Sequence, residues 1–149
     1  MGGYWCTANE LSDYIVDMCL SEGHPISNLQ LQKILYFCQL EYLRETDSFL
    51  FDDDFQAWKY GPVIPSVYRK YSIWGGKKIN FHSDWDYHIP NAVIETICDE
   101  IRSKRAKEPW ELVDETHKPG SAWSKVYKGG LGDGNVIAKE LLIEAAQHE

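Results

Sequence analysis

The sequence predicts a mainly α, compact single-domain helical fold with one small β-hairpin, over residues 1–149. Three observations predict this fold. Apolar residues recur at helical spacing in several segments, which is typical of helices that share a core. A hydrophobic content of 44% and an aromatic content of 13% indicate a folded chain rather than a disordered one. A chain of 149 residues is also long enough to bury a core without disulfides or metals.

Two capping boxes mark the first two helices. In TANELSDYIVDMCLSEG, the Thr7 hydroxyl can accept a hydrogen bond from the backbone three residues on, while Glu10 reaches back. Ser27 and Gln30 repeat this pattern at the start of the second helix, ISNLQLQKILYFCQLEYLRE. Apolar residues in this second segment extend well beyond one stripe, so we expect a central helix that is buried on most sides.

The segment after the second helix predicts a hairpin and then a corner. Two short aromatic runs flank the acidic residues 52–54, which suggests a small hairpin at that place. Pro62 restricts Gly61 before it and is expected to end strand pairing, so the Gly-Pro step fixes a strand-to-helix corner. Pro65 suits the first turn of the next helix, which is expected to close at Gly75-Gly76.

The second half of the chain predicts further helices. Residues 77–89 alternate in polarity and are expected to form a strand or an extended arm. One helix is expected to begin at residue 90 or 91 and run to about residue 104, and the next begins at Pro109, in PWELVDETHK. A glycine-rich loop leads to the last helix, VIAKELLIEAAQ, for which Asn135 is the expected N-terminal cap.

Charge and cysteine content limit the classes of function. Fifteen Lys and Arg against 23 Asp and Glu give a net charge of −8, which disfavours non-specific binding to nucleic acid. Because neither a signal peptide nor an apolar run of about 20 residues is present, we expect a cytoplasmic protein with reduced cysteines and no membrane contact.

Catalysis and metal binding find little support in the sequence. No local signature marks a Cys or Ser as a nucleophile. One alternating row has metal-binding side chains, but on a strand its ends stand roughly 20 Å apart, too far for one ion; its members are His82, Asp84, Asp86 and His88. We therefore expect no enzyme activity, no metal and no cofactor.

The segment Lys59–Lys78 is a basic-aromatic patch. It holds five bases and no acid: Lys59, Arg69, Lys70, Lys77 and Lys78. Tyrosines and a tryptophan are interleaved with them, whereas residues 45–54 hold five acids and no base. The patch and the acidic segment are interpreted as two solvated faces that balance one another. One alternative is a surface for an acidic protein partner, because Tyr, Trp and Arg dominate interface hot spots. A second alternative is a nucleic-acid-binding regulator, although the patch is short.

Three blocks of the sequence follow a specific pattern in order and spacing. They are PISNLQLQKILYFCQLEYL, LFDDDFQAWKYGPVIPSVYRKY and LVDETHKPGSAWSKVY. Together they resemble the Panacea domain, a family that includes SocA-like antitoxins and phage-associated GepA-like proteins, and the resemblance spans nearly the whole chain.

The resemblance implies a function without chemistry of its own. It implies a protein that neutralises the product of a neighbouring toxin gene by direct contact, in some members as an adaptor that presents the toxin to a protease. Because the domain is common in phages and prophages, the alternative is a phage-encoded inhibitor of a host defence protein, such as an anti-CRISPR.

The resemblance also singles out residues. A structural role is expected at Trp58, Gly61, Pro62, Pro65 and Trp123, with both tryptophans in the core. Partner contacts are expected at Lys33, Lys59, Tyr60, Tyr68, Arg69, Lys70 and His117. For His117, a hydrogen-bonded structural role is the alternative. If the shared motif preserves only the fold, partner choice is expected to depend on residues 49–55 and 77–89.

Overall fold

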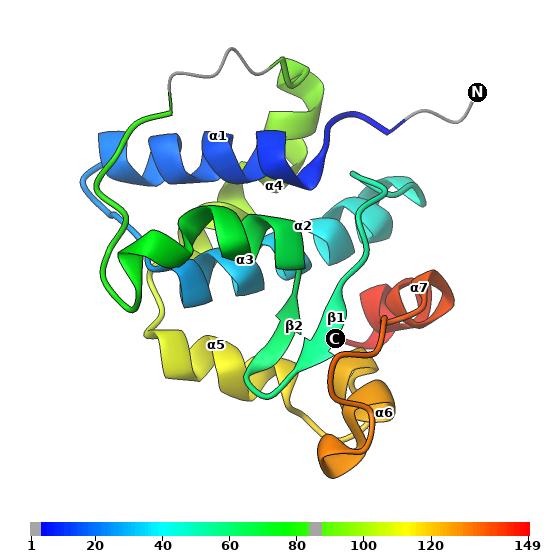
Figure 1. Cartoon of the computed structure of the whole chain (residues 1–149). Coiled ribbons are helices and arrows are strands. Elements are labelled where there is room, and N and C mark those ends of the chain that lie inside the picture. Colours follow the sequence, from blue (N-terminus) through cyan, green and yellow to red (C-terminus); the bar gives the residue numbers. More distant parts are fainter. Residues whose placement is uncertain (1–3, 84–87) are drawn as a thin grey trace.

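The computed structural model describes residues 4–83 and 88–149, and it confirms a mainly helical fold with one two-stranded antiparallel hairpin (Figure 1). The elements follow one another as α1 (Ala8–Ser21), α2 (Asn28–Thr46), β1 (Gln56–Trp58), β2 (Gly61–Val63), α3 (Pro65–Tyr71), η1 (Ser72–Trp74), α4 (Asn91–Arg105), α5 (Pro109–Thr116), α6 (Ala122–Tyr127), η2 (Lys128–Gly130) and α7 (Lys139–His148).

Helix α2 is the centre of the fold, as its apolar pattern predicts. Fourteen of its nineteen residues are buried. It contacts α1, α3, α4, α5, α7 and β2, which surround it in Figure 1. Both predicted capping boxes form, since Thr7 Oγ1 accepts from the Glu10 backbone at 3.1 Å and Ser27 Oγ accepts from the Gln30 backbone at 3.3 Å.

Buried polar side chains of α2 hold the backbone of the segment that precedes α3. Gln39 accepts from Leu50 N at 2.7 Å and donates to Phe51 O at 2.9 Å. Gln32 accepts from Ile64 N at 3.0 Å. Buried polar groups require such partners, so these amides pair with backbone groups that would otherwise be left unsatisfied inside the core. The helix thus fixes the path of residues 50–64 through main-chain contacts.

The hairpin lies later in the chain than the sequence predicts. Its two strands flank a turn at residues 59–60, while the acidic residues 52–54 lie in the connection before β1. The expectation that Pro62 ends strand pairing is also wrong, because Pro62 is the register partner of Ala57. The Ala57 N–H donates instead to Asn135 O at 2.8 Å, so β1 does not need the N–H that proline lacks.

The segment before α7 runs along the free edge of β1. Gly134 N donates to Ala57 O at 2.8 Å, and Ile137 N donates to Phe55 O at 2.8 Å. Asn135 is therefore part of this edge and does not cap the last helix, which begins at Lys139 without a side-chain cap. The prediction of an Asn135 cap is wrong because the hairpin engages its backbone.

The predicted arm is described only in part. Residues 77–83 are irregular, and Ile79 N donates to Ile26 O at 2.8 Å beside a bridge between Ser27 and Lys78. Asp84 and Asp86, from the alternating row, lie outside the described residues. Among the described helices, none is long and apolar enough to span a bilayer.

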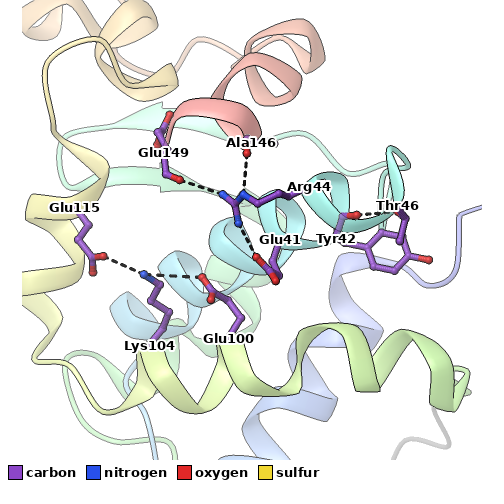
Figure 2. Close-up of polar contacts among 9 residues, drawn as sticks. All are labelled: Glu41, Tyr42, Arg44, Thr46, Glu100, Lys104, Glu115, Ala146 and Glu149. Atoms are coloured by element: carbon purple, nitrogen blue, oxygen red, sulfur yellow. Dashed lines mark hydrogen bonds and ion pairs between the residues drawn. The ribbon is translucent and has the colours of Figure 1, made fainter.

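Charged side chains attach α7 and α5 to the central helices (Figure 2). Arg44 of α2 donates to Ala146 O at 2.8 Å and to Glu149 O at 3.0 Å. Lys104 of α4 lies 2.9 Å from the carboxylate of Glu115 in α5. These contacts tie the C-terminal helices to the same core that carries the hairpin.

Candidate partner-binding site

Three distant parts of the chain meet at Gly61. The Lys33 ammonium from α2 donates to Pro62 O at 3.1 Å, and Thr116 from the end of α5 lies beside it. A Cβ on Gly61 would stand 2.7 Å from both Lys33 Cε and Thr116 Oγ1, and the φ of Gly61 is +114°. The close approach and the positive φ both require glycine, so the Gly-Pro step is a fixed structural feature, which we call the buried corner.

Lys33 is inside the protein. The sequence places it among the exposed partner contacts, but its side chain is fully buried beneath the hairpin. Burial lowers the pKa of Lys33 to about 7, because an ammonium loses hydration there and no carboxylate compensates for it. Because α2 is surrounded on nearly all sides, a position that is polar in the sequence still points inward.

A stacked ring pair covers the corner from α5 and α6. The rings of His117 and Trp123 lie 3.7 Å apart between centroids and are tilted by 3°. Trp123 is buried, and its indole N–H donates to Trp58 O at 2.7 Å. His117 is half-buried, and within the described residues its Nε2 is buried with no hydrogen-bond partner. Burial, and secondarily the charge of Lys33, lower the pKa of His117.

An aromatic groove opens on the outer side of the hairpin; its rings are Trp58, Tyr60, Tyr68 and Trp110, and its volume is about 460 Å³. The rings of Trp58 and Tyr68 meet edge to face at 5.1 Å, as do those of Tyr60 and Trp110 at 5.1 Å. Tyr60 and Trp110 are 44% and 57% exposed. Large aromatic side chains gathered in one exposed hollow indicate a binding surface.

Trp58 and Trp110 show what the sequence leaves undetermined. Trp58 is half-buried, not in the core, because Ala57 takes the inward position of β1 and successive strand residues face opposite sides. Trp110 has no place in the sequence prediction. The buried residues of α5 are Leu112, Val113 and Thr116. Trp110 lies outside this buried face, and an exposed tryptophan on a helix could have indicated a binding role.

The bases of the segment Lys59–Lys78 include paired and unpaired ones, and Lys59 lines the groove. Lys70 is held by Asp13 of α1, with Nζ 2.6 Å from the carboxylate, so it serves the packing of α3 on α1. Lys59, Arg69 and Lys77 are exposed and have no ion-pair partner within residues 4–83 and 88–149. These three cations remain available for a partner.

Three of the four cysteines lie inside the protein. All four are free, and Cys6, Cys19 and Cys38 are buried. Burial raises the pKa of Cys6 to about 12, so this thiol stays protonated and is a poor nucleophile at neutral pH. No group of three or more His, Cys, Asp or Glu side chains in the described part of the chain is arranged to hold a metal ion.

Comparison with known proteins identifies the family of the chain. The family model described as "Antitoxin SocA-like, Panacea domain" matches residues 31–124, more than half of the chain. The chain belongs to this family. A Panacea-domain relative, Antitoxin SocA of Caulobacter vibrioides (strain NA1000 / CB15N), is 42% identical over 72 residues; the match covers 48% of this chain and 38% of that antitoxin. No solved structure matches the chain significantly. The matched Panacea segment contains the buried corner and the four rings of the aromatic groove.

Proposed function

We propose that this chain neutralises a partner protein by direct contact and acts as the antitoxin of a toxin–antitoxin pair. The observation that supports this proposal most is the exposed aromatic groove, which lies beside the buried corner. Family membership, in a family described as antitoxin SocA-like, supports the antitoxin role. The aromatic rings and unpaired cations around the groove are the side-chain types that dominate protein interfaces.

Hydrogen bonds from buried side chains hold the backbone around the groove. Its walls rest on three backbone groups that buried side chains hold: Lys33 binds Pro62 O, Gln32 binds Ile64 N and Trp123 binds Trp58 O. A preformed surface loses less conformational entropy on binding, so more of the contact energy appears as affinity. Occupying a toxin stoichiometrically requires such affinity and no bond chemistry.

Capture and toxicity assays test the proposal together. The tagged chain should retain one protein from an extract of its own cells, identified by mass spectrometry. That protein should arrest growth when it is expressed alone, and co-expression of the chain should restore growth. The Trp110→Ala variant should lose the rescue while it remains folded, because this side chain is mostly exposed.

The identity of the captured protein decides between the alternatives. A captured protein that is harmless when expressed alone would contradict the antitoxin role. Capture of a host defence nuclease would favour the phage-encoded inhibitor instead. Capture that increases when a protease is inactivated would favour the adaptor role.

A further inference from the structure

A second hollow adjoins the aromatic groove. It is lined by Ile73, Trp74, Gly75, Gly76 and Lys77, and its volume is about 540 Å³. The two glycines also line the aromatic groove, so the hollows meet there, and we call this pair the diglycine saddle. Ile73 is 88% exposed, so its apolar side chain is accessible to a ligand in this hollow.

The saddle has space above it. A Cβ on either Gly75 or Gly76 would meet no atom within 4 Å. Gly75 has a φ of +56°, for which glycine is suited at the end of η1. Gly76 has no such φ, so neither backbone conformation nor crowding within the described residues requires glycine at this position. Its missing side chain leaves a flat crossing between the two hollows.

Among the described residues that line the two hollows, the charged side chains are both lysines. Lys59 lines the aromatic groove and Lys77 lines the second hollow, and both lack an ion-pair partner among the described residues. Glu108 and Glu111 flank Trp110 in the sequence and form the capping box of α5; their carboxylates keep their charge but do not line either hollow. A ligand that crosses the saddle therefore meets a cation on each side.

We propose that the two hollows together bind one extended acidic segment of the partner protein, with its backbone on the diglycine saddle and an apolar side chain in each hollow. A segment in the polyproline II conformation is extended, with about 3.1 Å per residue and three residues per turn, so side chains three positions apart point to the same side and stand roughly 9 Å from each other. Carboxylates of the segment then lie near Lys59 and Lys77. This inference rests on the proposed function and specifies the chemistry of the partner.

Single-stranded nucleic acid is the competing ligand class. Aromatic rings and cations also bind unstacked bases. In the groove, however, the rings form two edge-to-face pairs, Trp58 with Tyr68 and Tyr60 with Trp110, and the chain carries a net charge of −8. An oligonucleotide carries a charge at every nucleotide and meets that repulsion fully, whereas a peptide with a few carboxylates meets less of it. The observations therefore favour a protein segment.

A peptide titration of the full ¹⁵N-labelled chain tests the inference directly. The probe is the synthetic peptide DDLPALDD, whose two leucines stand three positions apart. It should cause saturable NMR shifts of the Gly75 and Gly76 amides and of the Trp58, Trp74 and Trp110 indole N–H groups. The peptide DDSPASDD, which lacks the apolar side chains, should cause none.

Filling the saddle provides the matched variant. Gly76→Leu adds a side chain into open space, so the melting temperature should stay unchanged while binding of DDLPALDD weakens by at least about tenfold, equivalent to about 1.4 kcal/mol. Ser103→Leu adds the same side chain to an exposed position of α4 that lines neither hollow, and it should bind like the parent.

Several results would overturn the inference. These are the absence of shifts at the saddle at millimolar peptide, equal binding of KKLPALKK, or shifts of the same resonances by the oligonucleotide dT10 alone. Because the titration needs no toxin, its failure is separate from failure of the toxicity assay. Growth rescue that persists in Gly76→Leu would leave the antitoxin role intact and would place the toxin on another surface.

Discussion

Replacing Lys33 with methionine should remove a pH dependence of stability that the parent chain possesses. Burial holds the Lys33 pKa at about 7 in the folded protein, whereas a lysine in the unfolded chain titrates at about 10.4. Between these two values the unfolded chain binds one more proton than the folded one. The free energy of unfolding therefore rises with pH in this window, and below pH 7 the contribution is constant at its least favourable value.

The magnitude follows from the two pKa values. From pH 7 to pH 9, Lys33 should add about 2 kcal/mol to the stability of the parent, at up to about 1.4 kcal/mol per pH unit. Methionine keeps the apolar stem but has no ammonium, so its stability should lack this increase. The Pro62 carbonyl loses its donor at every pH, which costs about 1–3 kcal/mol and shifts the curve without changing its slope.

Urea unfolding followed by tryptophan fluorescence at pH 7, 8 and 9 measures the effect. The difference between parent and variant cancels the groups that titrate in both proteins. Lys59→Met, at an exposed lysine of the hairpin turn, is the control and should keep the slope of the parent. If Lys33→Met and the parent change in parallel with pH, then Lys33 keeps an ordinary pKa and is not buried as described.

Three further substitutions separate the scaffold from the binding surface. Gly61→Ala should lower the melting temperature strongly or prevent folding, because of the 2.7 Å contacts and the positive φ; an unchanged melt by circular dichroism would contradict the buried corner. Lys59→Glu combined with Arg69→Glu should weaken partner capture in a pull-down while the melt stays nearly constant; equal loss of both would show that these side chains support the fold. Trp123→Ala should cost about 3–5 kcal/mol in urea unfolding, whereas Trp110→Ala should cost little and reduce capture; the reverse order would refute the assignment of core and groove.

Local signals in the sequence predicted local structure well. The capping boxes at Thr7 and Ser27 need only residues three positions apart, and both form. The hairpin was placed too early because its position depends on a remote partner. Gln39 of α2 binds the backbone at residues 50 and 51 and keeps that stretch out of a strand.

The sequence predicted some residues of the candidate site, but it did not predict which way their side chains face. The aromatic block contributes Tyr60 and Tyr68 to the groove, but which side of the hairpin Trp58 faces depends on strand register. Lys33 is polar in the sequence, and only the packing around α2 turns it inward. Trp110 joins the groove through a tertiary contact with Tyr60 that no local pattern encodes.

Side chains of α2 bind the backbone of residues 50–64, and this has a consequence for how the surface can evolve. Gln32, Lys33 and Gln39 bind backbone carbonyl and amide groups, which every amino acid provides except for the N–H that proline lacks. These hydrogen bonds to the backbone of residues 50–64 therefore do not depend on which outward-facing side chains that segment carries. If the chain binds its partner through this surface as proposed, substitutions of those side chains can change the partner while the hydrogen bonds from α2 stay in place.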